Sequence, residues 1–170
     1  MTWLPEGPVR PDPDRLNDYW QRASGELRDS GLTEDYQVRW IGLDDATTEE
    51  VIQLIIAGDK TGTFSLPWLI AQTRQLSPAV DDCIILIDFK GRPRLLVRLT
   101  GIHSVNFGNV SAADIAIDGS PVRDLKIWIP LHTQYWNSLL NPFDMQVSDD
   151  MPVLVEKFEL LHVNAAEAND

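Results

Sequence analysis

The side chains best suited to chemistry lie together in a short segment, residues 58–66. The segment reads Gly-Asp-Lys-Thr-Gly-Thr-Phe-Ser-Leu, so Lys60 is followed by hydroxyl residues at alternate positions, namely Thr61, Thr63 and Ser65. If residues 61–66 are extended, the three hydroxyls share one face of a strand. An ammonium beside a row of hydroxyls can hold a phosphate or a nucleobase, or can support acyl transfer.

Catalysis by this segment requires an activated hydroxyl. A threonine becomes a nucleophile only beside a base, and a lysine amine serves as that base only if its pKa falls well below about 10.4. Burial or a neighbouring cation lowers the pKa of an amine. Lys60 and Thr63 are therefore the candidate catalytic pair of an enzyme. In a binding module the same residues would contact the ligand.

The elements on either side of the segment predict how it is positioned. Thr47 and Glu50 have the spacing of a capping box, which predicts the start of a helix. Gly58 suits the position just after the end of that helix. The residues of this helix expected to face inward are Val51, Leu54 and Ile55. Lys60 and Thr63 would then be held at a fixed helix-to-strand junction.

The remaining pattern predicts an α+β fold, a mixed β-barrel with flanking helices. Residues 12–31 contain one apolar stripe at helical spacing, formed by Leu16, Tyr19, Trp20, Ala23 and Leu27. Strands are expected at residues 36–43, 83–89, 94–99, 102–107 and 152–162, with a bulge between Val155 and Phe158. Residues 125–140 form an aromatic helical pattern in which Pro130 favours a kink or a later start. We expect one domain over residues 1–170, with residues 1–13 as a flexible arm.

Composition limits the function classes. The chain has 170 residues and a formal net charge of −12, from 14 basic and 26 acidic side chains. Binding to nucleic acid depends on neutralising phosphates, so long duplex DNA is an unsuitable partner. A nucleotide, a modified nucleoside or a short single-stranded RNA in a local groove remains compatible. No stretch approaches the ~20 apolar residues of a membrane span, and the start lacks a signal-peptide pattern, so we expect a cytoplasmic protein.

Other cofactor and metal chemistry finds little support in the sequence. The histidines are scattered and there is a single cysteine, so no metal site is expected. The segment around Gly58 and Gly62 lacks the spacing of a phosphate-binding loop of ATPases. We therefore expect no cofactor.

Four further residues are candidate ligand contacts. Arg94 and Arg98 belong to the densest basic stretch, with Lys90 and Arg92, and form either the solvent face of a hairpin or a phosphate contact. His132 lies on the aromatic helix, where it is either a packed histidine or a ligand contact. Trp68 is the tryptophan expected to be exposed, and it could stack on a base.

Several of these pieces also occur together in a known family. The sequence resembles the bacterial stand-alone branch of the ASCH family, whose fold is a PUA-like β-barrel, over about Leu16 to His162. The matching pieces are Tyr19-Trp20, residues 57–63 with Ser65, Gly91-Arg92-Pro93, residues 105–107, Trp128 with His132, and residues 150–153 with Glu156 and Phe158.

The resemblance implies RNA binding or nucleoside chemistry. ASCH domains resemble RNA-binding modules, and some members are amidohydrolases that remove the acyl group of N4-acetylcytidine; ribonuclease activity has also been ascribed to members. The working set of the amidohydrolase resembles Lys60, Thr63 and a glutamate on a later strand. An ungapped fit places Arg98 at the glutamate position, where it cannot act as an acid or base and would favour an anion.

Two hypotheses follow from the sequence. The first is a module that binds RNA, a nucleotide or a modified nucleoside in a cleft lined by Lys60, Thr63, Ser65 and Arg98. The second is a hydrolase of N4-acylated cytidine nucleosides or, less favoured, a ribonuclease. We rank binding first because Arg98 replaces the expected carboxylate.

Overall fold

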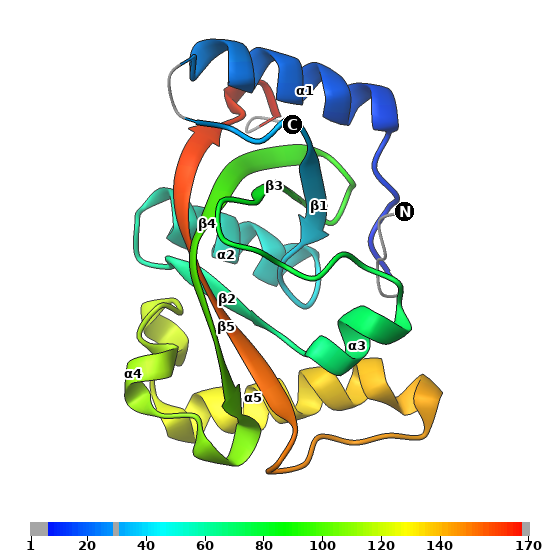
Figure 1. Ribbon diagram of the computed structural model, residues 1–170, viewed down its shortest axis with the longest axis vertical. Helices are drawn as coiled ribbons and strands as arrows, with labels where there is room; N and C mark the ends of the chain where they lie inside the picture. Colours follow the sequence, from blue (N-terminus) through cyan, green and yellow to red (C-terminus); the bar gives the residue numbers. More distant parts are fainter. Residues whose placement is uncertain (1–6, 29–30, 168–170) are drawn as a thin grey trace.

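The fold is built on one mixed sheet. The computed structural model describes residues 7–28 and 31–167. Its five strands have the order β1-β3-β4-β5-β2; β1 pairs with β3 in parallel, and the other neighbours are antiparallel. The strands are β1 (Tyr36–Trp40), β2 (Gly62–Ser65), β3 (Cys83–Ile87), β4 (Pro93–Asn106) and β5 (Pro152–Val163). The long strands β4 and β5 run side by side through the molecule and connect its two ends (Figure 1).

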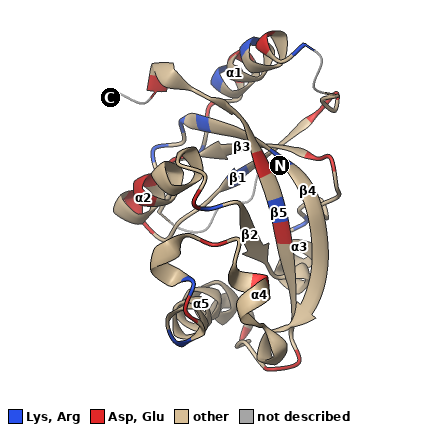
Figure 2. Ribbon diagram, turned by 90° about the vertical axis from the view of Figure 1, so that its left-hand side faces the viewer, with Lys and Arg blue, Asp and Glu red and all other residues tan. Residues whose placement is uncertain are grey.

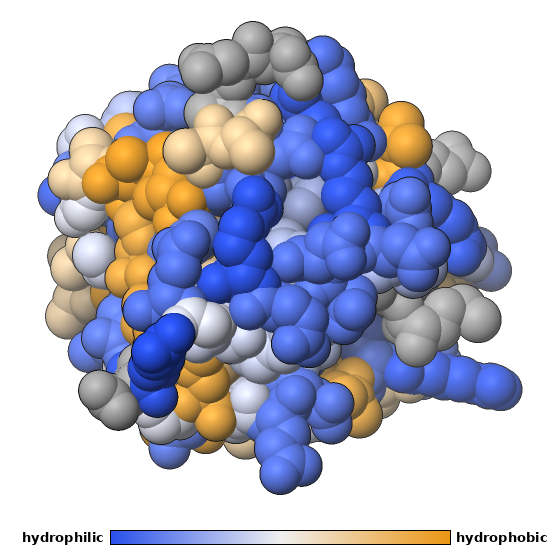
Figure 3. All heavy atoms as spheres, turned by 90° about the horizontal axis from the view of Figure 1, so that it is seen from above, coloured by the Kyte–Doolittle hydropathy of each residue, from blue (hydrophilic) through white to orange (hydrophobic). Residues whose placement is uncertain are grey.

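Five α-helices surround the sheet. They are α1 (Pro13–Glu26), α2 (Asp45–Ile56), α3 (Pro67–Gln72), α4 (Ala112–Ile115) and α5 (Leu125–Leu140). Helix α1 lies at one end of the molecule and α5 at the other, with α2 beside the sheet between them (Figure 1). Acidic residues gather on the outer side of α2 (Figure 2), and the end of the molecule around α1 is largely hydrophilic (Figure 3).

The alternation of side chains in β3 and β4 divides the apolar core. Cys83, Ile85 and Ile87 pack against α1, whereas Ile84 and Leu86 pack with α2, because successive residues of a strand face opposite sides. A third apolar cluster, which includes Trp128 and Trp136 of α5, fills the end formed by α3, α5 and the far halves of β4 and β5. The stripe predicted for α1 is buried at Leu16, Tyr19, Trp20 and Ala23.

The α+β class predicted from the sequence is confirmed. The sheet is not closed into a full barrel, because its two end strands, β1 and β2, do not pair with each other within the described residues. The predicted strands at residues 94–99 and 102–107 form the single strand β4. The strand ladder between β4 and β5 shifts register between Leu99 and Gly101, opposite Phe158 and Lys157. The irregularity near Phe158 is therefore present, with the extra residue in β4.

Helix boundaries differ from the prediction at α2 and α5. The capping box of α2 joins Asp44 and Thr47, one turn before the predicted pair, because the Asp44 carboxylate accepts the Thr47 N–H at 2.8 Å while the Thr47 hydroxyl caps Asp44. Gly58 follows the helix with a positive φ of 74°, as expected. Helix α5 starts at Leu125 and continues through Pro130, so, of the two predicted alternatives of a kink or a later start, the later start is wrong.

The flexible arm predicted for residues 1–13 falls partly outside the described residues. Of the part that is described, Val9 donates its backbone N–H to the Phe89 carbonyl at 2.9 Å. Pro13 already belongs to α1, where the Asp12 carboxylate accepts the Asp14 N–H.

Gly62 at the start of β2 lies where no side chain fits. A Cβ at this position would approach the Glu156 carbonyl oxygen to 2.5 Å and would clash with the Ile117 side chain. We expect Gly62→Ala to lower the free energy of unfolding by about 1–3 kcal/mol, the usual cost of overpacking. Gly101→Ala is the matched control, because a Cβ there meets only the Lys157 side chain at 3.9 Å. Urea denaturation of both variants tests this, and equal stabilities would contradict it.

Candidate functional site

A cleft of about 360 Å³ opens between α2, β2, α5 and the chain that follows β1. Aromatic rings form much of its wall, so we call it the aromatic lobe. Its aromatic lining residues are Trp40, Phe64, His132, Tyr135 and Trp136, and its polar lining residues include Lys60, Thr63, Asp118 and Glu50.

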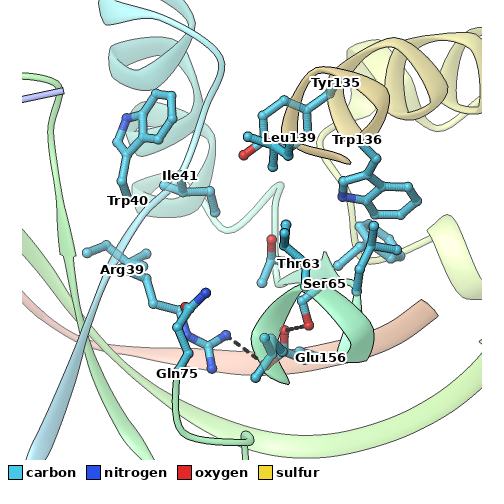
Figure 4. A pocket seen from close by; sticks show the side chains of 15 residues that line it. Arg39, Trp40, Ile41, Thr63, Ser65, Gln75, Tyr135, Trp136, Leu139 and Glu156 are labelled. Carbon is cyan, nitrogen blue, oxygen red and sulfur yellow. Dashed lines mark hydrogen bonds and ion pairs between the residues drawn. The ribbon is translucent and has the colours of Figure 1, made fainter. Parts of the chain in front are cut away.

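A second cavity of about 120 Å³, the narrow lobe, adjoins the aromatic lobe. The two lobes share Thr63, Phe64, Ile41 and Tyr135 among their lining residues, so they are parts of one cleft. In the narrow lobe, side chains of β1 and β2 face those of α5 across the cavity (Figure 4). It therefore lies in the opening between the two end strands of the sheet.

Lys60 forms a buried ion pair with Asp118 in the aromatic lobe. The Lys60 Nζ lies 2.6 Å from Asp118 Oδ1, and the two side chains are 6% and 7% exposed. Asp118 also accepts the Trp128 indole N–H at 3.1 Å and the Gly119 backbone N–H at 2.8 Å. Burial lowers the pKa of Lys60, and Asp118 opposes that shift. The lysine is therefore closer to a usable base than a lysine on the surface.

The loop that contains Asp118 is tied to the residue before Lys60. Arg123 donates to the backbone carbonyls of Asp118 and Asp59 and also pairs with the Asp59 carboxylate. Asp59 in turn accepts the Ser120 N–H at 2.7 Å. These bonds hold Asp118 and Lys60 at a defined separation.

Thr63 stands where the two lobes meet. It lies on β2 opposite Glu156 of β5, and it is only half-buried. Within residues 7–28 and 31–167 its hydroxyl has no hydrogen-bond partner, so it is available to a molecule in the cleft. The predicted grouping of Lys60 with Thr63 is thus present in one cavity.

Glu156 is a fully buried carboxylate at the wall of the narrow lobe. Its Oε1 lies 2.8 Å from Arg39 Nη1 of β1, and its Oε2 accepts the Ser65 hydroxyl at 2.8 Å (Figure 4). Ser65 is therefore in the cleft, as predicted, but its hydroxyl is already bonded. The ion pair links β1 to β5 across the opening between the ends of the sheet.

His132 contributes a neutral ring to the aromatic lobe. Its ring stacks on Trp128 with centroids 3.8 Å apart, and Nδ1 lies 2.9 Å from the Trp128 carbonyl oxygen. A carbonyl only accepts, so Nδ1 carries the proton and Nε2 is left as an acceptor. Burial lowers the pKa of His132 to about 4, despite the hydrogen bond to Trp128. Burial also raises the pKa of Tyr135 to about 12, so its phenol stays protonated.

The lowered pKa of His132 predicts a pH-dependent stability. Between pH 6.5 and 4 the unfolded chain binds a proton that the folded chain excludes, so this contribution is complete above pH 6.5 and is lost as the pH falls to 4. The loss amounts to about 3 kcal/mol. We expect His132→Phe to remove this part of the dependence in urea denaturation between pH 4 and 7. A His132 ring that titrates near pH 6.5 by NMR in the folded protein would contradict the prediction.

Two predicted contacts on or near β2 lie outside the cleft. Thr61 precedes the strand and is exposed; its backbone bonds to Ile117 and Phe158, and its side chain lines neither lobe. The expectation that all three hydroxyls line one site is therefore wrong. Trp68 is half-buried and packs edge-on against Phe143 beside the α5 core, so it is not the exposed stacking residue that was predicted.

The predicted arginines are also bound elsewhere. Arg94 is 3% exposed and pairs with Glu49 at 2.6 Å and Asp88 at 3.3 Å, where it ties α2 to the β3–β4 hairpin. Arg98 lies directly across from Glu159 in the β4–β5 ladder, and its Nε donates to that carboxylate at 2.8 Å. Neither arginine lines the aromatic or the narrow lobe. The arginine of the cleft is Arg39.

Sequence reasoning missed the cleft residues that come from distant segments. Asp118 lies 58 residues beyond Lys60, in a loop without a helical or strand pattern. Glu156 belongs to the predicted terminal strand and to the pieces that resemble the ASCH family, but the sequence assigns it no role in the cleft. Its one signal is a charged residue between Val155 and Phe158 in an apolar strand, where a buried charge requires a partner.

The described part of the chain contains no cluster of three or more potential metal ligands. Likewise, none of its helices has both the length and the apolar character needed to cross a bilayer.

The fold and the cleft define an α+β domain with a small cleft, lined by polar and aromatic side chains, at the open side of its sheet. The ASCH domain model matches residues 39–162, and the chain belongs to the ASCH domain family. The predicted family is thereby confirmed. No curated protein matches the chain.

Two solved structures share the fold over nearly the whole chain. A protein of Enterococcus faecalis V583 from the family DUF984 has a TM-score of 0.79 at 20% identity, and covers 92% of this chain and 94% of its own. The ASCH domain of Lactobacillus crispatus JV V101 has a TM-score of 0.77 at 18% identity, and the match covers 92% of this chain and 97% of that domain. At these identities the likeness concerns the fold alone.

Proposed function

We propose that the protein binds a neutral modified nucleoside in the aromatic lobe and hydrolyses its N-acyl group. The observation that carries this proposal is the buried Lys60–Asp118 pair, which opens into the same cavity as the unbonded hydroxyl of Thr63. The resemblance to N4-acylcytidine amidohydrolases implies a lysine, a threonine and a glutamate on a later strand; in this chain an aspartate from a loop lies beside the lysine instead. Asp118 supplies the carboxylate that Arg98 could not.

The charge of the cleft favours a neutral ligand. Its two cations, Lys60 and Arg39, are each paired with a buried carboxylate, Asp118 at 2.6 Å and Glu156 at 2.8 Å. An exposed acidic residue, Glu50, also lines the aromatic lobe. No net positive charge is left to attract a phosphate, whereas a flat, uncharged base gains from the aromatic walls.

The proposed reaction uses groups of this chain alone. Thr63 Oγ1 attacks the acyl carbon, a C–O bond forms and the C–N bond breaks. The Lys60 ammonium first passes one proton to Asp118, so that the free amine can take the hydroxyl proton of Thr63. Lys60 then donates a proton to the leaving nitrogen, water hydrolyses the ester to release the carboxylic acid and restore Thr63, and the proton returns from Asp118 to Lys60. Asp118 accepts one N–H of Lys60 and thereby fixes the orientation of the amine.

The test is an assay of acetate release from N4-acetylcytidine, with calorimetric titration of the same compound in parallel. We expect both binding and turnover by the purified protein. Binding without turnover would leave a nucleoside-binding module. If the compound neither binds nor reacts at substrate excess, the proposal is wrong.

A second candidate, binding of short single-stranded RNA, is favoured by a separate groove. The groove, of about 960 Å³, lies between α1, β1 and the chain after α3. It is lined by Tyr36, the edge of the largely buried Trp20, Arg10 and Arg74, and also by the carboxylates Glu34 and Asp35. Both arginine side chains are exposed, and neither pairs with a carboxylate within the described residues. Aromatic rings beside cations are the composition that holds bases and phosphates of single strands.

This candidate predicts salt-sensitive binding of a fluorescein-labelled hexauridine. The double variant Arg10→Glu/Arg74→Glu should weaken it at least tenfold at low salt. The control Lys126→Glu/Lys157→Glu makes the same change in net charge at exposed positions outside the groove. Equal weakening by both pairs would show that only net charge matters.

A further inference from the structure

The narrow lobe lies beyond Thr63 as seen from the aromatic lobe, and its walls differ from those of its neighbour. Apart from the residues that both lobes share, its walls are mainly aliphatic: Leu66, Leu69, Ile70, Leu86 and Leu139. Its polar groups are Ser65, Gln75 and the Arg39–Glu156 pair. It is thus an aliphatic compartment with one polar wall.

The position of Thr63 decides which part of a ligand can occupy this compartment. In an N-acylated base the acyl group lies on one side of the amide bond and the base on the other. With the base among the aromatic rings and the carbonyl carbon at Thr63, the acyl chain points into the narrow lobe. The sugar, which is attached to the other side of the base, then lies on the side of the aromatic lobe away from Thr63.

The size of the compartment exceeds what an acetyl group needs. An apolar cavity of about 150 Å³ accommodates a benzene ring. The narrow lobe, at about 120 Å³, therefore has room for a chain of about four carbons. A butanoyl chain has four carbons, including the carbonyl. A longer chain would reach the buried Arg39–Glu156 pair and would separate it from any water, which is unfavourable.

We propose that the narrow lobe is the subsite for the acyl chain and that it selects unbranched acyl groups of about four carbons over acetyl. This inference rests on the proposed function and adds the class of acyl group to it. Leu139 of α5 limits the length of the acyl chain that fits, because it is half-buried and lines the narrow lobe but not the aromatic lobe.

The experiment compares kcat/KM for N4-acetyl-, N4-butanoyl- and N4-hexanoylcytidine. We expect kcat/KM for butanoyl to exceed that for acetyl about fifteenfold, since each of the two additional buried methylenes contributes about fourfold, and the value for hexanoyl to fall below that for butanoyl. Leu139→Trp should reverse the preference toward acetyl, and Leu139→Ala should move it toward hexanoyl. The control Leu131→Trp fills the aromatic lobe and should lower kcat/KM for all three substrates by a similar factor.

The outcomes separate this inference from the proposed function. If acetylcytidine is hydrolysed but chain length has no effect, or both Leu139 variants keep the wild-type order, the acyl subsite is wrong and the hydrolase stands. Calorimetric binding of the three compounds to Thr63→Ala should give the same order of affinities without turnover. If none of them binds or reacts, both proposals fail.

Discussion

Thr63→Ala should lower kcat for hydrolysis of an N4-acylcytidine by a factor of about 10³ or more. The substitution removes the proposed nucleophile and leaves Lys60 and Asp118 in place, so the remaining rate comes from binding and polar stabilisation alone. Stability should change little, because the Thr63 hydroxyl bonds to no other described group. The measurement is product release under saturating substrate, with urea denaturation in parallel.

Two further threonine variants make this result specific. Thr61→Ala is the matched control, since it removes the same hydroxyl two residues away at an exposed position that lines neither lobe. It should keep full activity. Thr63→Ser should keep a substantial part of the wild-type activity, because serine retains the hydroxyl. Wild-type kcat in Thr63→Ala would mean that water attacks the acyl carbon directly, and the covalent route would be abandoned.

Asp118→Ala should lower the free energy of unfolding by about 3–5 kcal/mol, the cost of breaking a buried ion pair from one side. The Lys60 ammonium would be left buried without its counter-charge, and the Trp128 indole N–H would lose its acceptor. Asp118→Asn should cost less, because an amide oxygen still accepts hydrogen bonds. Thermal and urea denaturation measure the difference.

A double variant shows whether the loss comes from the unpaired charge. When both members of a buried pair are replaced by apolar residues of similar size, the cost is often small. Lys60→Met/Asp118→Leu should therefore be more stable than Asp118→Ala alone, although inactive. If the double variant is less stable by the sum of the single losses, the packing around Asp118 matters more than its charge.

The fold could be predicted where short-range patterns decide it. The apolar spacing of α1 places Tyr19 and Trp20 in the core, and the apolar run 83–87 forms a strand buried on both faces. Gly58 follows α2 because a positive φ suits glycine there. These features depend on residues a few positions apart, which a single sequence displays.

The site could be predicted only for the part that one segment contains. Lys60, Thr63 and Ser65 lie in the cleft because β2 alternates in the expected way. Arg98 was assigned to the cleft from an ungapped fit. Asp118 comes from a loop whose place depends on Arg123 and on backbone carbonyls, and neither follows from periodicity.

The ion pair of Arg39, on the end strand β1, with Glu156, on β5 next to the other end strand β2, spans the opening of the sheet where β1 and β2 are not paired through their backbones. Widening this opening would break the Arg39–Glu156 ion pair but would leave the backbone hydrogen bonds between paired strands intact. The compartment in this opening can thus be resized in evolution by exchanging single side chains, without redesign of the scaffold.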